Sequence, residues 1–180
     1  MSRVPLLLPS ILLAAAGMQA GCKATQSAER ADYQMGEKAT AGPLTYTVIE
    51  SVWRSQLGSG FNIRVPERRF LLMTVSVSNH ASHDISVPLL TMENQNGQSF
   101  TESNNGEGVD NWFGLLRTIG PSQTQQGKIL FDAPLSSYRL RLTDGGETET
   151  GKYAWVNIPL RLDGDSEVGL PPADGIDGVK

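Results

Sequence analysis

Between residues 33 and 162, apolar and polar side chains alternate along the sequence with a period of two. Successive side chains of a β-strand point to opposite faces of its sheet, so this alternation predicts half-buried strands. The longest series sets Leu71, Met73, Val75 and Val77 against Leu72, Thr74, Ser76 and Ser78. The other alternating segments are 44–48, 85–89, 129–131, 138–142 and 153–162. In two of them the pattern extends the core-facing series to Leu89, Leu160 and Leu162.

Turn signals separate these segments. Asn96-Gly97 is the pair that a type I′ hairpin turn requires, and Pro88 marks its strand as an edge strand or a bulge. About eight short strands with turns between them predict an all-β, antiparallel sandwich rather than an α/β domain. The segment 109–117 interrupts the alternation, and we expect it to form one short helical turn or an irregular packed loop.

The first 21 residues have the pattern of a secretory signal peptide, with Arg3, a short apolar run and then small residues. The apolar run is shorter than the ~20 residues that a membrane-spanning helix needs. Cys22, the only cysteine, directly follows Ala20 and Gly21, and this arrangement resembles the bacterial lipobox. In such signals the leader is cut before the cysteine, which is acylated. Gln19 departs from the pattern, because an aliphatic residue is usual there.

The composition divides the chain into four parts. Residues 1–21 are the predicted lipoprotein signal peptide, and 22–32 are the lipid anchor and a small, polar, flexible tether. Residues 33–162 are the predicted sandwich. Residues 163–180 are rich in glycine, proline and acidic residues, so we expect a disordered acidic tail.

Charge and cysteine content exclude several functions. The net charge of −4 argues against binding of nucleic acid, and a single cysteine excludes internal disulfides and cysteine-based zinc sites. His80 and His83 lie beside Asp84, as at the edge of a metal site, but turn-forming residues surround them. We interpret this segment as a loop between strands, and the acidic segment 163–167 as solvated tail rather than a calcium loop. We therefore predict no metal, cofactor or catalytic residues.

Trp112 and Phe113 stand at the end of a polar, glycine-rich loop within residues 103–117. Two interpretations are open. The rings could fold down with Leu115 and Leu116 and close one end of the sandwich. They could instead offer an exposed surface that contacts a partner or a glycan, since loops at the ends of a sandwich often carry binding function.

Several stretches together resemble a family of secreted bacterial modules, catalogued as domain of unknown function 4352. The matching stretches are Met35-Gly36-Glu37, 44–48, 69–79, 96–100, 119–121, 127–134 and 138–140. The resemblance covers roughly residues 33–145 and implies a telokin-like, immunoglobulin-like β-sandwich. Members are commonly lipoproteins or secreted proteins, which agrees with Cys22. The family has no established activity, so it supplies no catalytic residues.

These observations predict an extracytoplasmic lipoprotein that is not an enzyme and acts through contacts. Acylated Cys22 would hold it on a membrane, the outer one if the source is Gram-negative, and an envelope protein or glycan would be its partner. The alternatives are binding of an envelope glycan or small ligand through the 103–117 loop, and a cell-envelope hydrolase.

Overall fold

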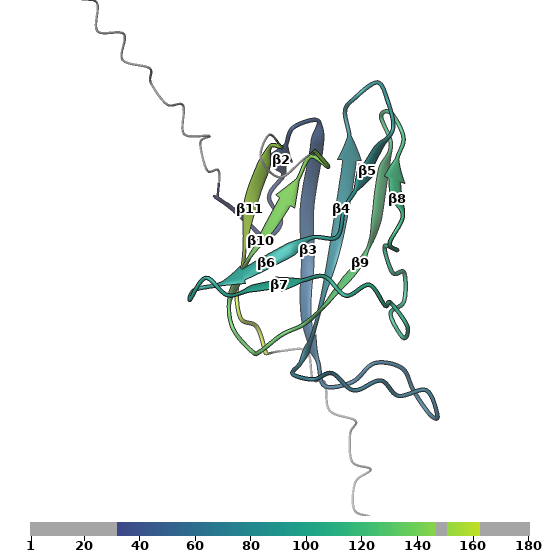
Figure 1. The fold of residues 1–180 in the computed structure, drawn as a ribbon, viewed down its shortest axis with the longest axis vertical. Helices are drawn as coiled ribbons and strands as arrows, with labels where there is room; N and C mark the ends of the chain where they lie inside the picture. The colour runs from purple at the N-terminus through teal and green to yellow at the C-terminus, as the bar shows by residue number, and fades with distance from the viewer. Residues whose placement is uncertain (1–31, 147–150, 163–180) are drawn as a thin grey trace, which may run out of the picture.

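A computed structural model describes residues 32–146 and 151–162, which form eleven β-strands (Figure 1). The predicted signal peptide, Cys22, nearly all of the tether and the acidic tail lie outside the described residues. The strands are β1 (Asp32–Gln34), β2 (Ala39–Ala41), β3 (Leu44–Arg54), β4 (Phe70–Asn79), β5 (Ile85–Val87), β6 (Thr91–Asn94), β7 (Ser99–Thr101), β8 (Arg117–Ile119), β9 (Thr124–Asp132), β10 (Tyr138–Thr143) and β11 (Tyr153–Ile158).

The strands form two larger sheets and a small ribbon. One sheet has the order β1-β11-β10-β6-β7, the other has the order β2-β3-β4-β9, and β5 pairs with β8. In Figure 1 the ribbon lies at the right-hand edge, beside the long strands β4 and β9. All pairings are antiparallel except that of β1 with β11. The prediction of an all-β fold is therefore confirmed.

The two larger sheets share one hydrophobic core, and the alternation predicts most of it. On β4, Leu71, Met73, Val75 and Val77 are at most 1% exposed, while the alternate side chains are half-buried. Strand β3 has a bulge where its register with β4 shifts between Val48 and Glu50. A bulge inserts one residue and changes the face of those that follow, so Trp53 is buried although the buried positions before the bulge, such as Val48, are even-numbered.

Three predicted core residues lie elsewhere. Strand β5 ends at Val87, and Leu90 is buried in place of Leu89. Strand β11 ends at Ile158, and Leu160 and Leu162 are exposed. In both cases a proline follows, Pro88 or Pro159. Proline has no N–H to donate to the neighbouring strand of the sheet. The strand therefore ends before the proline, although the alternation in the sequence continues beyond it.

The β6–β7 hairpin lies where Asn96-Gly97 predicts it, but its turn is of another type. The Gly97 amide donates to the Asn94 carbonyl at 3.0 Å, and Gly97 has a φ of 77°. Asn96 is not among the residues with positive φ, and a type I′ turn requires positive φ at both central positions. The prediction of type I′ is therefore wrong. Gln95 and Asn96 are the central residues of the turn, and Gly97, which follows them, adopts the left-handed backbone conformation.

The structure has more strands than the sequence predicts, because many of them are short. Strands β1, β2, β5, β7 and β8 have three residues each, which is too short for a clear alternation. No helix occurs among the described residues. Residues 109–116 are therefore an irregular loop that leads into β8 at Arg117, and of the two predicted forms the helical turn is wrong.

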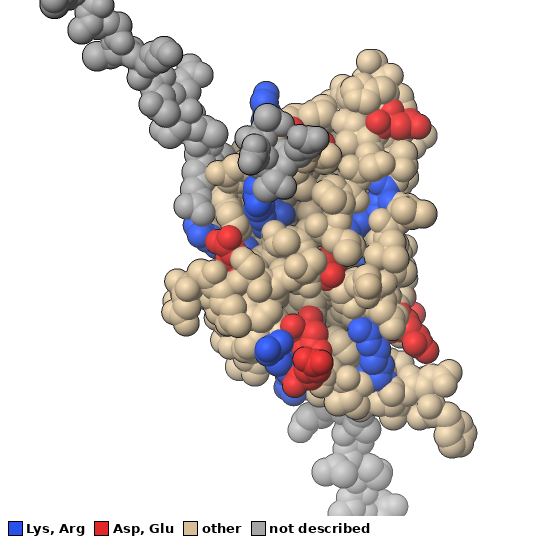
Figure 2. Space-filling model, viewed as in Figure 1, with Lys and Arg blue, Asp and Glu red and all other residues tan. Residues whose placement is uncertain are grey.

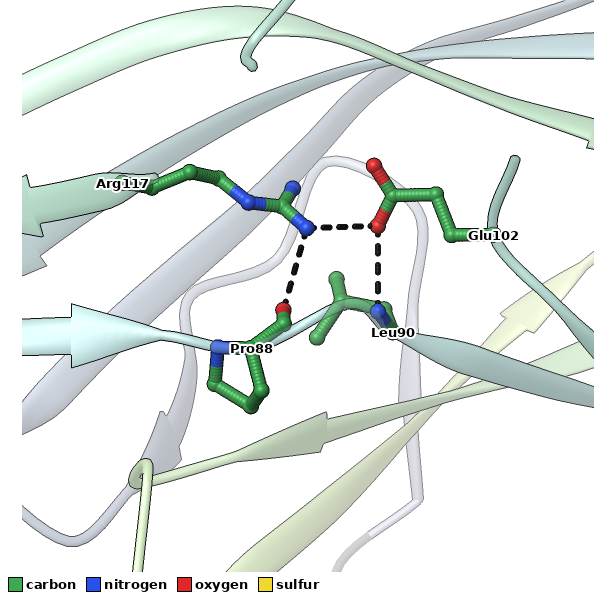
Figure 3. Close-up of polar contacts among 4 residues, drawn as sticks. All are labelled: Pro88, Leu90, Glu102 and Arg117. Atoms are coloured by element: carbon green, nitrogen blue, oxygen red, sulfur yellow. Dashed lines mark hydrogen bonds and ion pairs between the residues drawn. The ribbon is translucent and has the colours of Figure 1, made fainter. Parts of the chain in front are cut away.

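A buried ion pair joins the segments that pass between the sheets (Figure 3). The Arg117 Nη2 and Glu102 Oε2 atoms are 2.8 Å apart, and both side chains are fully removed from solvent. Arg117 also donates to the Pro88 carbonyl at 3.0 Å. Glu102 accepts from the Leu90 amide at 3.0 Å and donates its own amide to the Leu90 carbonyl at 2.9 Å. The pair thus fixes the chain between β5 and β6 to the ends of β7 and β8.

Some polar atoms of this pair have no partner among the described residues, namely Glu102 Oε1 and the Nε and Nη1 atoms of Arg117. Burial raises the pKa of Glu102 above its ordinary value, and Arg117 opposes the shift. The Arg117 guanidinium lies 5.1 Å from the centre of the Phe113 ring. A buried pair of this kind is destabilising if either partner is removed alone, because the other charge stays buried.

We expect Arg117→Met to lower the free energy of unfolding by about 3–5 kcal/mol, because it leaves the Glu102 carboxylate buried and unpaired. The double variant E102L/R117M should be more stable than R117M, since it buries no charge. Arg139→Met is the control. Its pair with Glu93 is partly exposed at 3.6 Å, so the loss should be at most about 1 kcal/mol. Urea unfolding measures all three, and an R117M loss no larger than that of R139M would contradict the role of the pair.

Candidate functional site

The predicted contact residue Trp112 packs on the loop that carries it. Its ring lies so close to Gly106 that a Cβ at that position would be 1.9 Å from the nearest ring atom. Trp112 also forms a parallel bridge with Lys128 of β9. Its side chain is half-buried, and its indole Nε1 has no partner among the described residues. The ring therefore leans on the loop and does not stand free.

Phe113 packs in the same way on β9. A Cβ at Gly127 would be 2.5 Å from the Phe113 ring, and the Phe113 amide donates to the Lys128 carbonyl at 2.9 Å. The ring is half-buried and packs against the main core. Arg117 covers it from the side of the buried ion pair. This geometry gives the packing interpretation more support, and the contact role of the two rings stays a prediction.

The apolar surface of the 103–117 loop comes instead from two leucines. Leu115 is 45% exposed and Leu116 is 98% exposed. One of the two open interpretations had both leucines fold down with the aromatic rings, and for the leucines it is wrong. Gly114, with a φ of 82°, directly precedes them. The chain reverses there, and the leucines point to solvent before Arg117 returns to the core.

The two histidines lie on the loop between β4 and β5. Buried Asn79 shapes this loop, because its side chain donates to the carbonyls of His83 and Ile119, both at 2.8 Å, and accepts from the Ala81 amide. His80 and His83 are exposed. Within residues 32–146 and 151–162, no group of three or more His, Cys, Asp or Glu side chains could hold a metal ion. The interpretation of 80–84 as a loop between strands is confirmed.

The β3–β4 loop extends beyond the sandwich and exposes apolar side chains. Leu57 and Arg64 exchange two backbone hydrogen bonds of 2.9 Å, which make the base of the loop a short ladder. Phe61 is fully exposed at its tip, and Val65 is 71% exposed. In Figure 2 this tip, at the lower right, carries no charge, while both signs are scattered over the rest of the visible face.

The outward face of the five-stranded sheet carries stacked cationic and aromatic side chains. The Arg139 guanidinium lies 4.8 Å from the centre of the Trp155 ring, and Arg141 lies 4.7 Å from that of Tyr153. The two aromatic rings contact each other edge to face at 6.3 Å. Such a contact contributes about 0.5–1 kcal/mol at an exposed ring and about 2 kcal/mol at a desolvated one. Tyr153 is 38% exposed and Trp155 is 4% exposed, so the stack of Arg139 on Trp155 is the stronger of the two.

Beside these stacks the sheet has a groove of about 450 Å³. It lies where β10 begins and β11 ends, next to the β6–β7 turn. We call it the amide groove, because side-chain amides are its commonest polar groups. It is lined by Gln34, Glu93, Asn94, Gln95, Gly97, Ser137, Tyr138, Arg139, Asn157, Ile158 and Pro159.

The amides of the groove differ in how they are bound. Asn94 accepts from the amides of Asn96 and Gln98, and Gln95 donates to the Ser137 hydroxyl at 3.1 Å. Within the described part of the chain, the side-chain amides of Gln34 and Asn157 make no hydrogen bond. One end of the groove is thus fixed by its own contacts, and the other has free donors and acceptors.

Sequence reasoning missed this groove. Its polar residues come from four strands and two loops, and only the register of the sheet brings them together. The only signal in the sequence was the group of amide side chains at 95–98. Such residues are equally typical of a simple turn, so they did not indicate a groove.

The comparisons with known proteins agree with this fold. The model of the family DUF4352, a domain of unknown function, matches residues 33–154, about two thirds of the chain. No curated protein matches the sequence. No helix in the described part of the chain is long and apolar enough to span a membrane.

Three solved structures illustrate the similarity. YjhA of Bacillus subtilis is 17% identical, over 70% of this chain and 98% of YjhA, with a TM-score of 0.53. The secreted protein MPT63 of Mycobacterium tuberculosis is 15% identical, over 73% of this chain and 99% of MPT63, with a TM-score of 0.54. The candidate lipoprotein YcdA of B. subtilis is 14% identical, over 69% of this chain but 39% of YcdA, with a TM-score of 0.52. At these identities the likeness concerns the fold.

Trp112→Ala distinguishes packing from an exposed contact surface. Because the ring packs on Gly106, we expect the variant to lose about 2–3 kcal/mol of unfolding free energy, less than a fully buried tryptophan would lose. Leu116→Ala, on the same loop but exposed, should change it by less than about 0.5 kcal/mol. Urea midpoints at unchanged slope measure both. Equal, negligible effects would show that the ring does not support the fold.

Proposed function

The chain belongs to the DUF4352 family, and from this membership we propose that it is an extracytoplasmic lipoprotein whose β-sandwich is a non-catalytic binding module. Acylated Cys22 is the membrane anchor in this proposal. The observation that carries it is the position of the only cysteine, directly behind a leader-like segment and two small residues. The folds of secreted MPT63 and the candidate lipoprotein YcdA support the same location.

The physics of lipid anchoring favours a permanent attachment. Each buried acyl CH₂ contributes ~0.8 kcal/mol, so one chain binds reversibly and two or more bind stably. Nine residues separate Cys22 from Asp32, where β1 begins. They can span at most ~32 Å. The anchor would therefore keep the sandwich within about one domain length of the membrane surface.

The chemistry of the amide groove supports binding rather than catalysis. Amide and hydroxyl side chains line it, and these hydrogen-bond a ligand readily but are weak bases and nucleophiles. Its charged groups, Glu93 and Arg139, form a pair with each other. A groove of this size lies in the range of ligand sites, ~300–1,000 Å³. The partner would be a component of the cell envelope.

Cys22→Ser tests the anchor. We expect the wild-type chain expressed in a bacterial host to incorporate an alkyne-labelled fatty acid, and C22S to incorporate none, because serine offers no thiol for acylation. The wild-type protein should stay in the membrane fraction through a high-salt wash. Ser27→Ala, five residues further on, is the control and should be labelled like the wild type. Equal labelling of C22S, or a wild-type chain without label, would refute the anchor.

A further inference from the structure

We propose that the amide groove binds an extended, neutral glycan of about three sugars. This inference rests on the proposed function, because it takes the module to face the glycans of the cell envelope. It names the ligand class and moves the site from the 103–117 loop to the outward face of the five-stranded sheet.

A straight row of polar side chains crosses the groove. The register pairs Gln34 of β1 with Asn157 of β11, Asn157 with Arg139 of β10, and Arg139 with Glu93 of β6. All four line the groove. Their neighbours Tyr33, Ile158, Leu140 and Met92 lie against or within the core, so the row faces outward. We call these four residues the polar row.

The spacing of the polar row fits a glycan. Neighbouring strands lie ~4.8 Å apart, which is close to the length that one sugar adds to an extended β-linked chain. The row spans three such intervals, or roughly 14 Å, about the length of three sugar rings. The four side chains would therefore lie near the two ends and the two linkages of a three-sugar chain.

The charge balance of the row favours a ligand without net charge. The Glu93 and Arg139 side chains are 3.6 Å apart and about one third exposed, so they largely neutralise each other. The remaining groups are amides, each of which has two donors and one acceptor oxygen. Sugar hydroxyl and acetamido groups also donate and accept, so they complement amides without requiring a counter-charge.

The groove is also held in shape before a ligand arrives. Arg139 is fixed between Glu93 and the Trp155 ring. Gln95 is tied to Ser137 at the other wall. Rigid groups lose little conformational freedom on binding. The unbound amides of Gln34 and Asn157 are then available for the ligand, and the exposed ring of Pro159 offers an apolar wall for the C–H face of a sugar.

Ligand-observed saturation-transfer NMR on the full acylated chain in detergent micelles tests the site. The probes are two β-1,4-linked tetrasaccharides, one of N-acetylglucosamine and one of glucose, and a neutral peptide of Ser, Asn and Gly. We expect transfer to at least one tetrasaccharide. Asn157→Ala and Gln34→Ala should each weaken its binding about tenfold, because each removes the free amide of the row.

Asn62→Ala is the matched control, since it removes an exposed amide from the distant β3–β4 loop and should leave binding unchanged. Thermal midpoints of all variants establish that they fold. Three results would overturn the proposal: no transfer to either sugar, equal weakening by N62A, or binding of the peptide alone. Fatty-acid labelling of the same samples separates the two proposals, because a chain that binds sugar without carrying lipid refutes the anchor and not the groove.

Discussion

A carboxylate and a guanidinium that are both fully buried can stay ionised only while each is the partner of the other. Glu102 and Arg117 meet this condition at 2.8 Å, and they also bind the backbone at Pro88 and Leu90. These contacts lie where the chain leaves the β5–β8 ribbon and enters the five-stranded sheet. The desolvation cost makes alternative paths for these segments expensive, so the pair specifies one connection between ribbon and sheet.

The position of β6 follows from this connection, and the amide groove follows from β6. Leu90 is buried next to the ion pair, and β6 begins one residue later at Thr91. Pairing with β10 then sets Glu93 opposite Arg139. The position of Glu93 in the polar row thus depends on a buried contact a few residues away. Stability and the shape of the amide groove are coupled here through a short stretch of backbone.

The sequence predicted the all-β fold and most of the core, because period-two alternation on β4 and β10 reports which face is buried. It could not locate strand ends at Pro88 and Pro159, since leucines continue the alternation beyond them. It also gave no sign that Glu102 and Arg117 are buried, because single charged residues in polar segments are usually exposed. Trp112 and Phe113 drew attention as large aromatic residues, yet each packs on a glycine whose importance only the fold reveals.

The polar row was beyond sequence reasoning for a different reason. Its residues are neighbours through register, and register is set by the opposite face of the sheet. A slip of β11 by one residue against β10 would turn Asn157 into the core and expose Val156 and Ile158, which are at most 2% exposed. Each buried aliphatic side chain contributes roughly 1.5–3 kcal/mol, so such a slip is strongly disfavoured. The apolar face therefore determines where the amides lie, and changes in the core that preserve register should preserve the groove.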